Sequence, residues 1–99
     1  MREIPEDLQN FWKEREEVEA FYLLPTSTSE SKDVLLWISH SPLSYFQRLD
    51  FYYPREKRRE YLKVFPITRE EFEKWPQDTR KRVMETLKKS RLLWKRSHD

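Results

Sequence analysis

Two acidic side chains, Glu30 and Asp33, stand directly before the apolar run VLLWIS and are the first residues that could do chemistry. Carboxylate oxygens are the ligands that Mg²⁺ prefers, so an aspartate at the entry to a strand can hold a metal ion. A metal cage needs several such oxygens, and this stretch offers one aspartate and one glutamate. We therefore interpret Asp33 as a strand-entry residue and Glu30 as an exposed one.

Histidine occurs twice. Ser39-His40-Ser41 places hydroxyls beside an imidazole, but no motif supplies the orienting acid or the oxyanion donors of a nucleophilic triad. We interpret this tripeptide as a loop. His98 is distant in sequence and the chain has no cysteine, so no zinc site is expected. The residue types therefore predict no resident metal or cofactor.

A basic stretch, residues 54–63, directly follows the aromatic run 51–53. Its cations are Arg55, Lys57, Arg58, Arg59 and Lys63. Cations beside aromatic rings can hold phosphates and stack bases, which would indicate a surface for nucleic acid or another partner. The alternative is a solvated helix, balanced by Glu56 and Glu60, whose aromatic neighbours lie in the core.

A second basic set lies toward the C-terminus. It comprises Lys81, Arg82, Lys88, Lys89, Arg91, Lys95 and Arg96. Trp94 lies among these cations and is the best candidate for an interface anchor, because tryptophan is enriched at binding hot spots. Trp12, Trp37 and Trp75 occur in apolar patterns and are expected in the core.

The elements that must position these side chains follow from hydrophobic periodicity. Residues 5–20 predict a helix whose apolar stripe is Leu8, Phe11, Trp12 and Val18. Strands are expected at 21–24, 34–39 and 62–67, the last on a sheet edge because it contains Pro66. Further helices are expected at 55–61, 69–75 and from 76 or 77 to about 90.

Two segments stay open. Residues 42–53 fit either a helix capped by Ser41, packing Leu43, Phe46 and Leu49, or a helix that gives way to an extended FYY before Pro54. Residues 91–96 fit either an extension of the last helix or a short final strand.

Composition indicates one ordered domain spanning residues 1–99. The apolar fraction is 36% and the charged fraction 38%, but 15% of the residues are aromatic and supply a large burial term. No apolar run approaches the length of a membrane span, and the N-terminal residues lack a signal-peptide core, so a cytoplasmic location is expected. Many Lys, Arg and Glu residues without cysteine also fit a heat-adapted protein.

Charge is distributed unevenly along the chain. Residues 1–50 carry 5 basic and 10 acidic side chains, net −5, whereas residues 51–99 carry 15 basic and 8 acidic, net +7. Such a split is typical of a protein whose second half binds an anionic partner, or of head-to-tail self-association, or simply of two faces that differ.

Four stretches in order carry a resemblance to a known family: VEAFYLL, DVLLWIS, LKVFPITREEFEKW and RLLWKR, within residues 17–96. This order resembles the minimal nucleotidyltransferase domains of the polymerase-beta type. The resemblance implies a Gly-Ser motif and a helix after the first strand, a D-x-D pair on the second strand and a third carboxylate on the third. In such enzymes the carboxylates hold divalent ions that clamp the attacking and leaving oxygens.

This chain departs from that pattern at each chemical position. PTSTSESKD stands where the family has Gly-Ser and a helix, and the chain has no glycine. Asp33 fills one place of the carboxylate pair, leaving Leu35 or Ser31 at the other, and Lys63 stands at the third carboxylate. Asp50 is a substitute only if residues 49–53 form the third strand. The resemblance with these departures implies a domain that has lost catalysis, with Mg²⁺ expected only if the site is rearranged around Asp33 and Asp50.

The predicted fold is therefore an α/β (α+β) domain, with helices packed on a small mixed sheet of three to four strands. The predicted function is a catalytically inactive, nucleotidyltransferase-like binding module. Its expected partner is a protein, either a second copy or a helical HEPN-type protein of the kind that family members pair with as toxin and antitoxin. The alternatives are a small basic protein that binds RNA or DNA, and an active nucleotidyltransferase.

Overall fold

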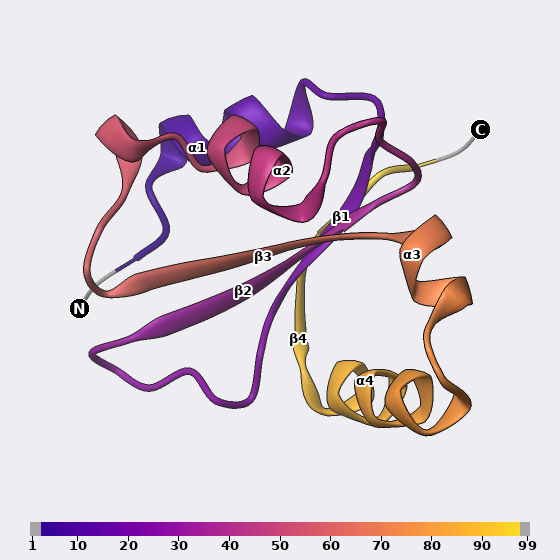
Figure 1. The fold of residues 1–99 in the computed structure, drawn as a ribbon. Helices are drawn as coiled ribbons and strands as arrows, with labels where there is room; N and C mark the ends of the chain where they lie inside the picture. The colour runs from indigo at the N-terminus through magenta and orange to yellow at the C-terminus, as the bar shows by residue number, and fades with distance from the viewer. Residues whose placement is uncertain (1–2, 98–99) are drawn as a thin grey trace.

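Four strands form one mixed sheet in the order β3-β2-β1-β4 in the computed structural model, which describes residues 3–97 (Figure 1). The central strand β1 (Val18–Leu23) pairs antiparallel with β2 (Lys32–Ile38) on one side and with β4 (Arg91–Lys95) on the other. β2 pairs in parallel with the edge strand β3 (Leu62–Thr68). The predicted class, a small α+β domain with a mixed sheet, is confirmed.

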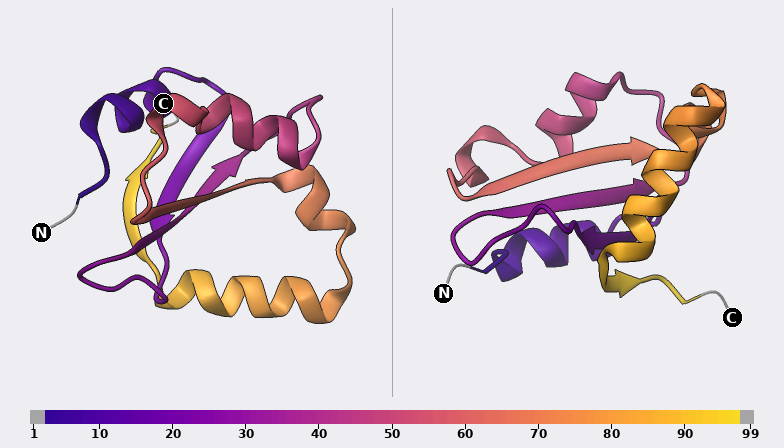
Figure 2. Two further views of the ribbon diagram at one scale, coloured as in Figure 1. Left: turned by 60° about the vertical axis from the view of Figure 1, so that its left-hand side comes forward. Right: turned by 90° about the horizontal axis from the view of Figure 1, so that it is seen from below.

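Helices lie on both faces of this sheet (Figure 2). α1 (Glu6–Lys13) and α2 (Tyr45–Tyr52) lie on one face, where α2 provides the crossover that a parallel β2–β3 pair requires. A 3₁₀ turn, η1 (Arg55–Lys57), follows α2. α3 (Arg69–Lys74) and α4 (Gln77–Lys89) lie on the other side.

The core lies between the sheet and the α1–α2 layer. Side chains alternate along β2, so that Val34, Leu36 and Ile38 lie on this face of the sheet. Leu35 and Trp37 lie on the opposite face. The fully or almost fully buried members of the core are Leu8, Trp12, Val18, Phe21, Val34, Leu36, Ile38, Tyr52, Tyr53, Leu62 and Val64.

The opposite face is covered less completely. Phe72 of α3 packs edge-on against Trp37, with ring centroids 5.3 Å apart. α4 crosses this face, but among its described residues none is buried, and an apolar hollow of about 230 Å³ remains between it and the sheet. α4 is therefore a surface helix whose outer side is available for contacts.

Two predicted helices were too long. The helix expected at 5–20 ends at Lys13, because Val18–Ala20 pairs with both neighbouring strands as part of β1, and this pairing overrides helical propensity. The helix expected at 55–61 is only the turn Arg55–Lys57. Arg58 is extended, the hydroxyl of Tyr53 accepts a hydrogen bond from the backbone N–H of Arg59 (2.8 Å), and a turn from Arg59 to Leu62 leads into β3.

The two open segments are now assigned. Residues 45–52 are helical, so the extended FYY alternative is wrong for Phe51 and Tyr52, while Tyr53, before Pro54, leaves helical geometry. The cap is Ser44, in a capping box with Gln47, rather than Ser41, and Phe46 points outward with 76% of its surface exposed, so the expected apolar stripe through Phe46 was wrong. Residues 91–95 form β4.

Trp12 is fully buried as expected, whereas Trp37 and Trp75 are only partly buried. Pro66 does lie on an edge strand. No helix within residues 3–97 is long and apolar enough to span a membrane.

Arg96 joins the end of the chain to the end of α1. Its guanidinium donates hydrogen bonds to the carbonyl oxygens of Lys13 (2.7 Å), Arg15 (2.8 Å) and Val18 (3.0 Å) and lies over the ring of Trp94. Carbonyls at a helix C-terminus lack intrahelical donors, so this arginine satisfies groups that would otherwise need water. It thereby fixes α1, which carries the site described next.

Candidate functional site

Asp33, the first predicted carboxylate, lies at the start of β2 and is held by the preceding connection. Its carboxylate accepts a hydrogen bond from the hydroxyl of Thr26 (2.5 Å), and its backbone N–H donates to the hydroxyl of Ser27 (2.9 Å). The hydroxyl of Thr28 accepts from the backbone N–H groups of residues 30 and 31. Residues 24–31, all described, contain no helix. The segment PTSTSESKD is therefore a hairpin connection whose hydroxyl groups form hydrogen bonds within the segment itself.

Asp50, the second predicted carboxylate, lies on α2 and pairs with Arg58 at 2.8 Å. Asp33 alternates with core residues along β2 and so lies on the other face of the sheet. The structure does not bring these two carboxylates together. Lys63 is the β3 partner of Asp33 in the strand register, and it is exposed. Within residues 3–97 there is no group of three or more His, Asp or Glu side chains that could hold a metal ion.

The basic stretch 54–63 is largely engaged within the protein. Lys57 pairs with Asp7 (2.6 Å), and its hydrogen bond lowers the pKa of Asp7. Arg58 pairs with Asp50 and donates to the backbone carbonyl of Tyr53. Arg59 donates to the carbonyls of its two preceding residues, while Arg55 is exposed. This stretch adjoins α1. Of the second basic set, Lys81, Arg82, Lys88 and Lys89 lie on α4 on the other side of the sheet (Figure 1), Arg91 and Lys95 lie on β4, and Arg96 contacts the end of α1.

Trp94, the predicted interface anchor, is partly buried. Its ring stacks on Phe21, with centroids 5.5 Å apart, and the guanidinium of Arg96 lies 4.8 Å from its centroid. Its role as an anchor stays a prediction.

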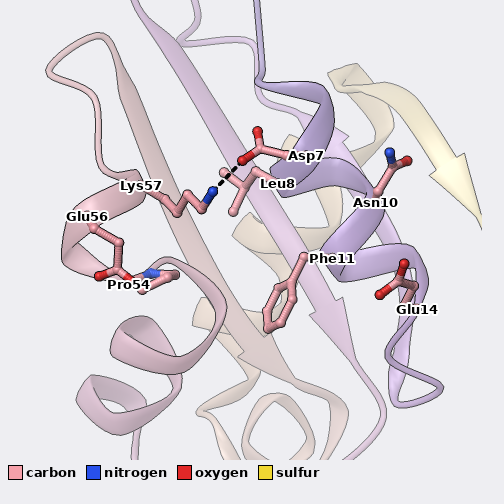
Figure 3. Close-up of a pocket in the computed structure, with 8 residues that line it drawn as sticks. All are labelled: Asp7, Leu8, Asn10, Phe11, Glu14, Pro54, Glu56 and Lys57. Carbon is pink, nitrogen blue, oxygen red and sulfur yellow. Dashed lines mark hydrogen bonds and ion pairs between the residues drawn. The ribbon is translucent and has the colours of Figure 1, made fainter.

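A hollow of about 490 Å³ lies between α1 and residues 54–57 (Figure 3). Leu8, Phe11 and Pro54 supply its apolar surface. Its polar lining is Asp7, Asn10, Glu14, Glu56 and Lys57. Asp7, Phe11 and Glu14 recur at the spacing of one helix face, so a carboxylate stands on either side of an aromatic ring.

An aromatic ridge, defined here as Phe11 and Phe51, bounds this hollow. The two rings, one from α1 and one from α2, lie 5.8 Å apart, and Phe51 is 43% exposed. On its other side Phe51 borders a second hollow of about 320 Å³, lined also by Glu17, His40, Ser41, Pro42, Leu43 and Tyr52. An exposed apolar ridge between two hollows is the shape expected of a binding surface.

The charge around the ridge is negative. Residues 3–19 carry seven acidic side chains and two basic ones. Arg15 lies over the ring of Phe11 at 4.7 Å, and Lys57, which also lines the hollow, pairs with Asp7. Three carboxylates against one cation leave the lining of the hollow negative. We call the surface formed by the aromatic ridge and the acidic side chains Asp7, Glu14 and Glu56 the acidic face.

A buried tyrosine supports this face from beneath. The hydroxyl of Tyr52 donates to the carboxylate of Glu17 (2.5 Å), and the backbone carbonyl of Tyr52 accepts from the indole of Trp12 (2.8 Å). Burial, followed by the hydrogen bond to the Glu17 carboxylate, strongly raises the pKa of Tyr52.

The raised pKa of Tyr52 predicts a loss of stability in alkaline solution. Tyrosines of the unfolded chain lose their protons near about pH 10, while Tyr52 keeps its proton in the folded protein, so the free energy of unfolding falls as the pH rises above this value. We expect the urea midpoint of Tyr52→Phe to fall less steeply than that of the wild type between about pH 9 and pH 11. Equal slopes for the two proteins would contradict the prediction.

Arg48 is the polar residue that the sequence analysis missed. It is 3% exposed and lies on the same side of α2 as Tyr45 and Tyr52. The sequence did contain an indication of this burial. Tyr45, Arg48 and Tyr52 follow the helical spacing i, i+3, i+7, so the charge of Arg48 falls on the same helix face as two aromatic side chains.

In comparisons with protein-family models, with curated proteins and with solved structures, this chain matches none. The relation to nucleotidyltransferases therefore stays a prediction from the sequence, and a function has to be inferred from the acidic face itself.

Proposed function

We propose that this protein is a binding module that holds a protein partner on its acidic face, through a helical segment of the partner that is both basic and apolar. The observation that carries the proposal is the exposed aromatic ridge between two hollows, set among carboxylates. An amphipathic helix binds such a groove through its apolar side, and charge at the rim selects helices of opposite sign.

Catalysis is not part of this proposal. The hydroxyl of Thr26 engages Asp33, Arg58 engages Asp50, and the two carboxylates lie on opposite faces of the sheet. Clamping a transferred phosphate between divalent ions requires carboxylates that converge on one site. The arrangement thus supports a binding role over nucleotidyl transfer.

Two synthetic amphipathic helices test the proposal directly. One combines leucine with lysine and the other leucine with glutamate in the same pattern. We expect the purified protein to bind the Leu/Lys helix in a calorimetric titration and not the Leu/Glu helix, because only the first complements the carboxylates of the rim. Binding of both helices, or of neither, would overturn the proposal.

Phe51→Ser should weaken binding of the Leu/Lys helix about tenfold or more, because Phe51 is the exposed apolar part of the ridge. Phe46→Ser is the matched control. It makes the same substitution on the same helix, at a ring that is 76% exposed but outside the ridge, and should leave the affinity unchanged. Equal losses from the two substitutions would mean that the binding surface is not the ridge.

The same titrations can be repeated with a short single-stranded DNA or RNA. The nucleic-acid alternative would be favoured if the protein bound the nucleic acid with an affinity that falls steeply with salt and did not bind the Leu/Lys helix.

A further inference from the structure

We propose that the helical segment received by the acidic face is α4 of a second copy of this chain. The inference rests on the proposed function, because it names the partner for the same surface. It starts from two surfaces of unlike charge. The acidic face is built on α1, and a basic helix, α4, lies on the other side of the sheet (Figure 1).

The outer side of α4 carries a basic and apolar stripe. Val83, Thr86 and Leu87 are partly buried on its inner side. Lys81, Met84 and Lys88 fall on the outer side at helical spacing and are exposed, Met84 to 45%. This stripe places cations on either side of an apolar side chain, with the exposed carboxylate of Glu85 next to them.

The spacings of the two stripes match in one orientation. Along α1, Asp7 and Phe11 are four positions apart, and Phe11 and Glu14 are three positions apart. In the C-to-N direction along α4, Lys88 and Met84 are four positions apart, and Met84 and Lys81 are three positions apart. Each stripe therefore extends about 10.5 Å at 1.5 Å per residue, with its apolar residue at the same position.

An antiparallel pairing of the two helices follows. It places Lys88 opposite Asp7, which also pairs with Lys57 of its own chain, and Lys81 opposite Glu14. Met84 lies on the ring of Phe11, beside the guanidinium of Arg15. A thioether against an aromatic ring is a favourable contact, and ammonium groups opposite carboxylates fix the register. A parallel pairing would offset Met84 from Phe11 by one residue, so the spacing itself selects the antiparallel arrangement.

The association is head-to-tail. α1 and α4 lie on opposite sides of the sheet. A partner whose α4 packs on the α1 of one copy therefore cannot also receive the α4 of that copy on its own α1. Contacts of this heterologous kind build rings or open chains rather than a two-fold dimer.

A charge exchange between two chains tests the register. Glu14 and Lys81 are both exposed, and among the described residues the Glu14 carboxylate pairs with partly exposed Arg15 at 3.7 Å, so the substitutions are made at the surface. Sedimentation velocity at low salt on nuclease-treated protein should show wild-type self-association that weakens at about 0.5 M salt. We expect Glu14→Lys alone and Lys81→Glu alone each to associate about tenfold or more weakly, since each places like charges opposite one another.

Restoration is the decisive result. An equal mixture of the two variants, or the double variant Glu14→Lys/Lys81→Glu, should recover wild-type association. Glu14→Lys/Lys88→Glu should not recover it, because Lys88 faces Asp7 in the proposed register. Lys74→Glu, an equal change of charge on α3, should leave association unaffected.

Three outcomes would overturn the inference: a wild-type protein that stays monomeric, variants that associate as the wild type does, and a mixture that fails to recover association. If the protein still binds the Leu/Lys helix in any of these cases, the proposed function stands and only the identity of the partner is wrong. If both experiments fail, the acidic face is not a protein-binding surface.

Discussion

Replacing Arg48 with alanine is expected to lower the free energy of unfolding by about 3–5 kcal/mol, the cost typical of breaking a buried ion pair by removing one partner. The side chain of Arg48 is 4% exposed. It donates to Glu71 (2.5 Å), to the carbonyl of Pro66 (3.0 Å) and to the carbonyl of Leu43 (2.8 Å).

The size of the effect follows from what alanine leaves behind. The carbonyls of Pro66 and Leu43 would lose their donor, and the Glu71 carboxylate would lose its cation in a partly buried setting. Glu71 also closes the capping box of α3 with Thr68. The substitution should therefore loosen the junction between α2, the end of β3 and the start of α3.

Urea denaturation measures the loss as a lower midpoint at unchanged slope. Arg58→Ala is the matched control. Arg58 pairs with Asp50 on the surface, and exposed pairs contribute about 0–1 kcal/mol. Arg48→Lys should retain only part of the stability, because an ammonium group cannot reach three acceptors in the geometry of a guanidinium. A loss below about 1 kcal/mol for Arg48→Ala would contradict our interpretation of the junction.

Trp12→Ala is expected to cost about 3–5 kcal/mol, the range for deleting a fully buried tryptophan. The indole packs edge-on against Phe21 (5.1 Å) and donates to the carbonyl of Tyr52 (2.8 Å). It thereby joins α1, β1 and α2 at one point. Domains of this size are stable by about 5–15 kcal/mol, so the substitution should remove between about a fifth and all of the stability of the protein.

Circular dichroism during thermal unfolding follows this loss. Trp12→Phe should recover much of the stability, because a smaller aromatic ring refills most of the space while the hydrogen bond stays lost. Trp75→Ala serves as the control, since that ring is only partly buried at the end of α3 and should cost about 1–2 kcal/mol. Similar losses at positions 12 and 75 would show that the core is not centred between α1 and the sheet.

Local patterns predicted most of the elements because their signals lie within a few residues. The capping box of Thr68 and Glu71 begins α3 where it was expected. Pro66 indicated an edge strand, since a residue without an N–H is poorly tolerated in a central one. The same reasoning failed at Val18–Ala20, where pairing to strands distant in sequence replaced a plausible helical continuation.

The candidate site was harder to predict because its residues come from separate segments. Phe11 and Phe51 are 40 positions apart, and no spacing rule joins them. The basic stretch 54–63 fitted either a binding surface or a solvated helix, and in the structure Lys57 and Arg58 pair with carboxylates on α1 and α2. The sequence shows which charged side chains are present. Whether each charge is neutralised depends on which side chains lie beside it in the folded protein.

The amino-acid sequence by itself determined the α+β class, three of the four strands as apolar runs, the starts of α1, α3 and α4 and the net charge of each half of the chain. The tertiary structure alone decided that Lys57 and Arg58 meet carboxylates on α1 and α2, that Asp33 and Asp50 do not meet, and that Arg48 lies buried. The physical reason is range: propensity and capping act over three or four residues, whereas burial, pairing and charge compensation arise between segments that the fold brings together.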